Sequence, residues 1–467
     1  KFPIMIQSNV CVLHGLSTDA RFNLGECKHD YGGYFIIDGK EKLIISQEKF
    51  ADNMLYIREY PAKSDYTHSA EIRSVSEDTS KPIRVNTIAI VAPTARYTNL
   101  QIVVNIPNVR KPIPLFILMR ALGLESDKQI IEYCLLDLNK NQKYIDLFIP
   151  SVHHASVVFN QQTALEFIAL LTKRKHTVSV QDILMNYFLA HVGTTNFIDK
   201  AYFVGYMVRK LLRVYLKDDK PTDRDSFKCK RVELSGSLMY DLFREYYLTQ
   251  KKKIELAVDR LHFNNSQYRG EFIVETFPSI KEIFKKHGLI VQDGVRSGFK
   301  GNWGSMQYTK RVGLVQDVAR LSWNAFISHL RKVNLEMDST SKVVKPHLLN
   351  NSQYGYIDPL DTPDGGNVGL HKHISMSTVI TTEYSGDALI GWMNQRFVII
   401  PISSCLPSFA YEHTKLFVNG KWVGLVENPL KMVDILKLYK RNGIIPFHTS
   451  IRFNYKDNEI TIYTDGG

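Results

Sequence analysis

Strand-like and helix-like segments lie in separate blocks along this chain, and their order limits its fold more than any other feature. Residues 25–50 and 70–106 carry β-branched and aromatic runs with turn residues between them. Three prolines within 107–114 then mark the passage to helical patterns, and strand-like runs return from Ser377 onward. This order predicts the α+β class, and a chain of 467 residues is long enough for several domains.

The clearest local prediction is a β-hairpin near the start of the chain. Asp38-Gly39 separates the runs Tyr34–Ile37 and Lys42–Ile45, and this dipeptide suits a tight turn between strands. Further strands are expected at 87–91, 101–106, 397–402 and 415–418, the last followed by an Asn419-Gly420 turn. Helices are expected at 115–122, 127–136, 162–173, 180–190, 198–216, 232–260 and 428–441.

One more helix is predicted between Arg311 and Asn334, where apolar residues recur at spacings of four, three and four. These residues are Leu314, Val318, Leu321 and Ala325. Arg331 and Lys332 would lie in its last turn, where basic side chains suit the helix dipole.

Other features bear on the type of protein. The apolar runs are far shorter than the ~20 residues that cross a bilayer, and no signal peptide is present, so we expect a soluble protein. The chain does not begin with Met, so we expect a fragment. The polar loop 217–230 is an expected domain boundary. Five scattered cysteines without a C-x-x-C pair favour a reducing, intracellular compartment and mostly buried thiols.

The net charge of +12 favours polyanionic partners, although a merely basic soluble protein would share it. Residues 281–345 hold twelve Lys and Arg against five Asp and Glu, which is more than half of the excess. The same window carries four glycines and three aromatic residues, a composition that could approach phosphates and stack on bases. Alternatively, the glycines only form turns and the tryptophan fills a core. These residues are Gly294, Gly298, Gly301, Gly304, Phe299, Trp303 and Tyr308.

Asp358–Gly366 has three carboxylates and two prolines in nine residues. Its carboxylate spacing excludes an EF-hand, so it is read as a stiff turn that holds Asp361 and Asp364 in fixed directions, or as an ordinary surface turn. His371 and His373 could share one face of a strand as metal ligands, but surface histidines are the preferred interpretation. No phosphate loop, dinucleotide fingerprint or nucleophile–base pair is present, so the residues alone indicate a multidomain polyanion-binding protein.

Several short strings are distributed across nearly the whole chain. In chain order they are Pro3-Ile4-Met5, Glu26-Cys27, Gly32 to Lys42, Gln47-Glu48, Asp223 to Phe227 with Lys230-Arg231, Gly301 to Gly304, Ser328 to Lys332, and Pro359 to Gly365 with Gly369-Leu370. Taken together and in this order, they resemble the second-largest (β-type) subunit of multisubunit DNA-dependent RNA polymerases.

The resemblance implies a mixed helix and antiparallel-sheet lobe and protrusion, a fork, and a partly β external region. Residues 1–50 and 236–295 would form the protrusion, 51–235 the lobe, 296–375 the fork and 376–467 the external region. Lys28 follows Cys27 where the family usually has proline, and this drift suggests a large eukaryotic DNA virus as the source.

The resemblance also implies site residues. Those near nucleic acid would be Lys300, Trp303, Lys310, Arg331, Lys332, Lys342, Lys345 and His347, and those near the incoming nucleotide Asp361, Asp364 and Lys372. Asp361 and Asp364 replace the family's glutamates, and His347-Leu348 stands where eukaryotic members commonly have Arg-Gln. These changes shorten or remove possible contacts.

By the resemblance, the assembled enzyme would be a DNA-directed RNA polymerase, a nucleotidyltransferase, whose Mg²⁺ is bound by the largest subunit. This chain would have no catalytic or metal-binding residue and would be inactive alone. Its partners would be the largest and other polymerase subunits, template DNA and the RNA–DNA hybrid, with no membrane, in the nucleus, a viral factory or a virion. A non-catalytic polyanion-binding scaffold or virion protein is the alternative.

Overall fold

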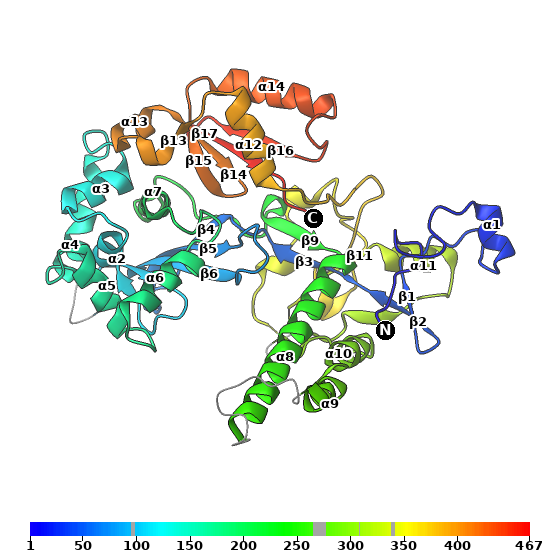
Figure 1. Cartoon of the computed structure of the whole chain (residues 1–467). Coiled ribbons are helices and arrows are strands. Elements are labelled where there is room, and N and C mark those ends of the chain that lie inside the picture. The colour runs from blue at the N-terminus through cyan, green and yellow to red at the C-terminus, as the bar shows by residue number, and fades with distance from the viewer. Residues whose placement is uncertain (95–98, 265–276, 308, 338–340) are drawn as a thin grey trace. The chain divides into compact units, whose positions relative to one another are not determined.

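The computed structural model describes residues 1–94, 99–264, 277–307, 309–337 and 341–467, and they form two compact units. Unit 1 comprises Lys1–Lys49, Asp225–Ile380 and Gly467, and unit 2 comprises Phe50–Arg224 and Thr381–Gly466. One division falls inside the polar loop 217–230. Four sheets, antiparallel or mixed, and many helices in the described ranges confirm the α+β class (Figure 1).

The first sheet of unit 1 contains the predicted hairpin. Asp38 and Gly39 both have positive φ angles, of 50° and 78°, as a tight two-residue turn requires. The third strand lies about 270 residues later in the chain and pairs antiparallel with the second. The strands are β1 (Phe35–Ile37), β2 (Lys40–Ile44) and β10 (Val315–Asp317), in the order β1-β2-β10.

The second sheet of unit 1 joins four segments that are distant in the sequence. Its strands are β3 (Ser46–Phe50), β9 (Lys230–Glu233), β11 (Lys332–Leu335) and β12 (His371–His373), in the order β12-β11-β3-β9. β11 is parallel to β3 and antiparallel to β12. This sheet carries much of the candidate site.

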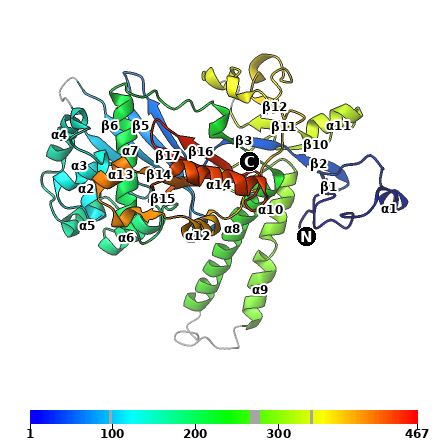
Figure 2. The same ribbon diagram turned by 90° about the horizontal axis from the view of Figure 1, so that it is seen from above.

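The helices of unit 1 are α1 (Thr18–Asn23), α8 (Ser235–Asn264), α9 (Phe277–His287), α10 (Ile290–Phe299) and α11 (Trp323–Leu330). Of these, α8 and α10 contribute side chains to the apolar cluster of the unit. α9 and α10 lie beside α8 (Figure 2). Phe35, Leu242, Phe299 and Trp303 meet in the core of this unit.

Two predictions for the basic window are wrong. Gly294 and Gly298 lie within α10, where a Cβ at Gly294 would stand 2.4 Å from the Tyr246 ring, so they permit close packing on α8. The helix expected between Arg311 and Asn334 is confined to α11, because Leu314 is buried beside β10 and Leu321 is 94% exposed. Pairing of β10 with β2 overrides the local spacing.

Unit 2 begins with an antiparallel sheet. Its strands are β4 (Leu55–Glu59), β5 (Tyr66–Ser74), β6 (Arg84–Val91), β7 (Ile102–Asn105) and β8 (Ile113–Pro114), in sequence order. The helices that follow are α2 (Leu115–Ala121), α3 (Asp127–Leu135), α4 (Ile149–His154), α5 (Gln161–Leu170), α6 (Thr177–Asn186) and α7 (Phe197–Tyr215). α7 packs against β4 and β5.

The second part of unit 2 is a mixed sheet with three helices. Its strands are β13 (Ile400–Pro401), β14 (Thr414–Val418), β15 (Lys421–Val426), β16 (Ser450–Asn454) and β17 (Glu459–Tyr463), in the order β13-β15-β14-β17-β16, and its helices are α12 (Gly386–Arg396), α13 (Pro407–Glu412) and α14 (Pro429–Arg441). The ring of Tyr206 on α7 packs on Phe417 and Trp422, so both parts of unit 2 share one core.

Most other predicted elements are confirmed within a few residues at each end. The strand expected at 397–402 is reduced to β13, since a 3₁₀ turn begins at Ile402. Of the cysteines, only Cys134 and Cys229 are fully buried and Cys27 is exposed, so the expectation of mostly buried thiols is wrong.

Candidate nucleic-acid interface

The loop after α10 is held to the core by an indole and a carboxylate. Trp303 is 4% exposed and packs edge-on against Phe299. Its ring therefore fills the core, and the prediction that it stacks on bases is wrong. Tyr308 lies outside the described residues.

Glu245 of α8 fixes the next part of this loop. One carboxylate oxygen accepts hydrogen bonds from the backbone N–H groups of Ser305 and Met306, at 3.0 and 3.1 Å, and from the Thr309 hydroxyl at 2.6 Å. Burial alone would raise the pKa of Glu245, but these donors lower it overall. Gly304 has a φ of +105°, and a Cβ there would stand 2.4 Å from the Thr309 carbonyl oxygen. The loop thus has one tightly specified shape.

Some of the predicted phosphate-binding cations already have partners within the protein, and others are exposed without an ion pair. Lys300 forms an ion pair with Asp38 at 3.3 Å, and Arg331 donates to the Ser375 carbonyl at 2.6 Å. Lys310, Lys342 and Lys345 are exposed, and in the described residues they have no ion pair.

The other two predicted nucleic-acid residues lie partly inside unit 1. Lys332 is half-buried at the start of β11. His347 is also half-buried, and its Nδ1 donates to the Val368 carbonyl at 2.8 Å. That bond fixes the ring against the segment after the Asp358–Gly366 turn and leaves Nε2 as its other polar atom.

The backbone of the Asp358–Gly366 turn is held by its first carboxylate, that of Asp358. Asp358 accepts hydrogen bonds from the N–H groups of Leu360 and Asp361, at 2.9 and 3.3 Å. Asp361 is exposed and lies 3.1 Å from Nδ1 of His373. Asp364 is exposed and precedes a 3₁₀ turn without a side-chain capping bond. Asp364 therefore points to solvent in this chain.

Strand β12 fastens this turn to the sheet. The Asp358 N–H donates to the His373 carbonyl at 2.9 Å, and the Thr362 hydroxyl donates to the His371 carbonyl at 2.9 Å. His371 also lies 2.7 Å from the Asn334 side-chain oxygen through Nδ1. The two histidines thus serve the loop and the neighbouring strand, and both are half-buried and not surface residues as preferred from the sequence.

Lys372, between these histidines, enters a buried ion triad. Its ammonium lies 2.6 Å from one oxygen of Glu48, and the Lys230 ammonium lies 2.9 Å from the other. All three residues are at most 6% exposed. Burial alone would raise the pKa of Glu48, but Lys372 and Lys230 lower it overall. The Lys372 ammonium is therefore held inside the sheet and does not extend toward solvent.

Sequence reasoning did not assign roles to Glu48, Lys230 or Glu245. Glu48 and Lys230 were noticed only as parts of family strings, and 324 residues separate Glu48 from Lys372. Glu245 lies 60 residues before Ser305, from whose N–H it accepts a hydrogen bond. No local spacing joins such partners, so only the folded sheet and helix reveal them.

Nothing in the described ranges suits a metal centre or a membrane span. No three His, Cys, Asp or Glu side chains there meet in a way that could hold a metal ion. None of the helices described is both long and apolar enough to cross a bilayer.

Three stretches of this chain match models of known protein families. Residues 1–281 match the family described as RNA polymerase beta subunit, residues 316–380 match RNA polymerase Rpb2 domain 3, and residues 416–467 match Rpb2 domain 4.

Curated relatives match along the whole chain. DNA-directed RNA polymerase II subunit RPB2 of Encephalitozoon cuniculi is 34% identical over 478 residues, covering 100% of this chain and 40% of the relative. Subunit 2 of the Arabidopsis thaliana polymerase II is 32% identical, and subunit Rpo2 of Saccharolobus solfataricus is 27% identical, each over 100% of this chain and 39% or 40% of the relative. The chain thus spans about two-fifths of the length of these relatives.

Proposed function

This chain belongs to the RNA polymerase beta subunit family, and on that premise we propose that it is part of the second-largest subunit of a DNA-directed RNA polymerase. In the assembled enzyme it lines one wall of the DNA cleft, and its fork contacts template DNA and the RNA–DNA hybrid. The matches to polymerase subunits along the whole of this chain support this proposal and do not favour a scaffold or virion protein.

The proposal includes the parts named above: a protrusion from 1–50 and 236–295, a lobe from 51–235, a fork from 296–375 and an external region from 376–467. Residues 265–276 of the protrusion lie outside the described residues. A viral source and an intracellular, reducing location remain predictions.

One observation carries the role at nucleic acid. The exposed Lys310, Lys342 and Lys345 have no ion pair in the described residues, and the stretch that holds them shares unit 1 with the stiff Asp358–Gly366 turn. Exposed cations without an ion pair suit phosphate contacts, which position nucleic acid without reading its sequence. Lys372 would act from inside the sheet, by positioning the turn.

The catalytic Mg²⁺ of the complex would be bound by another subunit, the largest, and would activate nucleotidyl transfer there. This chain's contribution is to place phosphates and to hold the fork. Copurification of a tagged full-length subunit with the largest subunit would test the assignment directly, and recovery of the tagged subunit alone would contradict it.

Binding to duplex DNA tests the surface. Lys310→Gln, Lys342→Gln and Lys345→Gln together should lower the slope of log affinity against log salt by about 0.9 for each lost phosphate contact. Arg331 is left intact because its guanidinium holds two backbone carbonyl oxygens. Exposed lysines of unit 2, changed together as Lys63→Gln, Lys431→Gln and Lys437→Gln, give the same charge change as a control. Equal slopes for both triple variants would mean that the proposed surface is not the one used.

A further inference from the structure

A partly apolar groove lies between α5 and the start of α6 in unit 2. Its volume is about 420 Å³, within the roughly 300–1,000 Å³ of ligand pockets. Helix α5 supplies the apolar side chains of Phe167, Ala169 and Leu170, and Leu170 is 67% exposed. The lining residues, which define the α5–α6 groove, are Val158, Thr163, Glu166, Phe167, Ala169, Leu170, Lys175 and Thr177.

Two loops bring cations to this groove at the end of α5. Val109 forms an antiparallel bridge with Thr172, and the Arg110 N–H donates to the Leu171 carbonyl at 3.1 Å. The loop that begins at Arg110 therefore lies beside the turn between α5 and α6. The exposed cations of the loop and the turn, called the basic rim, are Arg110, Lys111, Lys173, Arg174 and Lys175.

The turn between α5 and α6 has a fixed shape. Thr172 is 1% exposed, and its hydroxyl donates to the Ala169 carbonyl at 2.8 Å and accepts from the Lys175 N–H at 3.2 Å. Lys175 has a φ of 55°, in the left-handed region that few side chains adopt. The turn thus presents three consecutive cations on an ordered backbone.

The charge of the basic rim is not balanced within the chain. Across the ranges that the structure describes, none of its five side chains has an ion pair or a hydrogen bond. The end of α5 offers about half a negative charge, but the start of α6 adds about half a positive one, with no acidic residue in its first turn. Glu166, the one carboxylate of the lining, accepts from the Gln162 amide at 3.2 Å.

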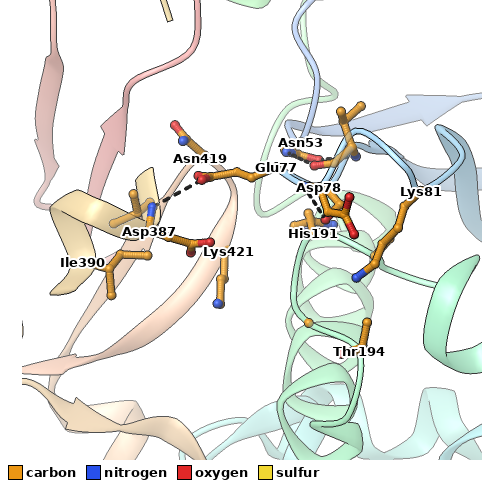
Figure 3. A pocket seen from close by; sticks show the side chains of 15 residues that line it. Asn53, Glu77, Asp78, Lys81, His191, Thr194, Asp387, Ile390, Asn419 and Lys421 are labelled. Atoms are coloured by element: carbon orange, nitrogen blue, oxygen red, sulfur yellow. Dashed lines mark hydrogen bonds between the residues drawn. The ribbon is translucent and has the colours of Figure 1, made fainter. Parts of the chain in front are cut away.

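The cavity beside His191, also in unit 2, is different (Figure 3). Lys81 interacts there with Asp78, and Lys421 interacts with Asp199. Three carboxylates and two lysines line that cavity: Glu77, Asp78, Asp387, Lys81 and Lys421. Its cations therefore need no outside anion, whereas those of the basic rim have no carboxylate within ion-pair distance among the described residues.

We propose that the α5–α6 groove and the basic rim bind an acidic, apolar segment of another protein. Carboxylates of the segment pair with the rim, and its apolar side chains cover Phe167 and Leu170. A nucleic-acid backbone would engage the rim and leave the apolar groove empty, so the groove favours a protein partner. The proposal goes beyond the polymerase role and does not rest on it, since it uses none of the residues of the proposed nucleic-acid surface.

The test is fluorescence anisotropy of the 467-residue chain with two labelled synthetic peptides, at low and at physiological salt. One peptide carries Glu and Leu at helical spacing, and the other has Lys in place of each Glu. Saturable binding is expected for the Glu peptide only, and its affinity should fall as salt rises. Lys173→Gln, Arg174→Gln and Lys175→Gln together, the rim variant, should weaken binding by about tenfold or more.

Two controls match these changes. Lys63→Gln, Lys431→Gln and Lys437→Gln together make the same charge change on exposed side chains of unit 2 and should bind like the wild type. Leu170→Ser should weaken binding by about tenfold, because a leucine side chain is then missing from the contact. Leu438→Ser on α14, 52% exposed in the wild type, should not. Thermal melting checks that each variant is folded.

Absence of saturable binding of the Glu peptide, or equal binding of both peptides, would overturn the proposal. Equal affinity of the wild type and the rim variant would also overturn it, since binding would then lie elsewhere. A labelled single-stranded oligonucleotide of the same net charge is the third probe. Tighter binding of that probe than of the Glu peptide, lost in the rim variant, would assign the rim to nucleic acid and overturn the proposal.

Discussion

Asp358 and Asp364 lie in the same turn, but only Asp358 accepts hydrogen bonds from the backbone of the turn. Asp358→Ala removes the acceptor of two exposed backbone N–H groups, so we expect it to lower the free energy of unfolding by about 0.5–1.5 kcal/mol. Asp364→Ala removes an exposed carboxylate without a capping bond, and the change should stay within about 0.5 kcal/mol. Urea denaturation of both variants measures the difference.

The role of Asp364 in elongation is tested in the assembled polymerase. Asp364→Ala should slow elongation or lower fidelity with unchanged stability, if the turn lies beside the incoming nucleotide. Normal elongation by this variant would remove Asp364 from the site.

Glu48 is the residue on which the second sheet of unit 1 depends most. Glu48→Gln leaves two buried ammonium groups facing a neutral amide, and we expect a loss of about 3–5 kcal/mol of unfolding free energy. Glu336→Gln, at an exposed pair with Arg311, is the control and should cost at most about 1 kcal/mol. A loss for Glu48→Gln no larger than for the control would show that the triad contributes little.

The pH dependence of this triad has a definite sign. The two lysines lower the folded-state pKa of Glu48 below its ordinary value, so its contribution is complete above the unfolded-state pKa. That contribution is lost as the pH falls through the lowered folded-state value. Denaturation between pH 7 and pH 3 should therefore show the wild type and Glu48→Gln converging in acid, and parallel curves would argue against it.

At the scale of elements, the sequence predicted what depends on neighbours along the chain. The Asp38-Gly39 hairpin and helices such as α7 follow from turn chemistry and from helical spacing, so both were found. The helix expected between Arg311 and Asn334 failed because β10 pairs with a strand about 270 residues away. Trp303 was open to two interpretations in the same way, base stacking and core filling, and only its core neighbours decide between them.

The loop after Trp303 offers an element-scale prediction. Glu245→Ala removes the acceptor of several donors, so unfolding free energy should fall by about 1–3 kcal/mol and trypsin should cut faster at Lys310 and Arg311. Glu245→Gln keeps one acceptor oxygen and should be milder. Unchanged cleavage rates in Glu245→Ala would show that the loop is held by other contacts.

At the scale of the whole molecule, the chain should be inert as an enzyme. Two-metal nucleotidyl transfer needs a centre that holds both ions, and the proposed function assigns that centre to the largest subunit. Incubation with template, primer, nucleotides and Mg²⁺ should give no extension, while the assembled polymerase, as the control, extends. Template-directed extension that survives stringent purification would contradict this prediction.

The discontinuity of unit 1 has a consequence during protein synthesis. Ser46 of β3 pairs with Val333, and at about 5–20 residues per second the ribosome needs roughly 15–60 seconds to make the chain between them. In that interval the nascent chain carries an unpaired strand and the Glu48 carboxylate without Lys372, while residues 50–224 can already build part of unit 2. The yield of folded protein therefore depends on how well those first residues are shielded during translation.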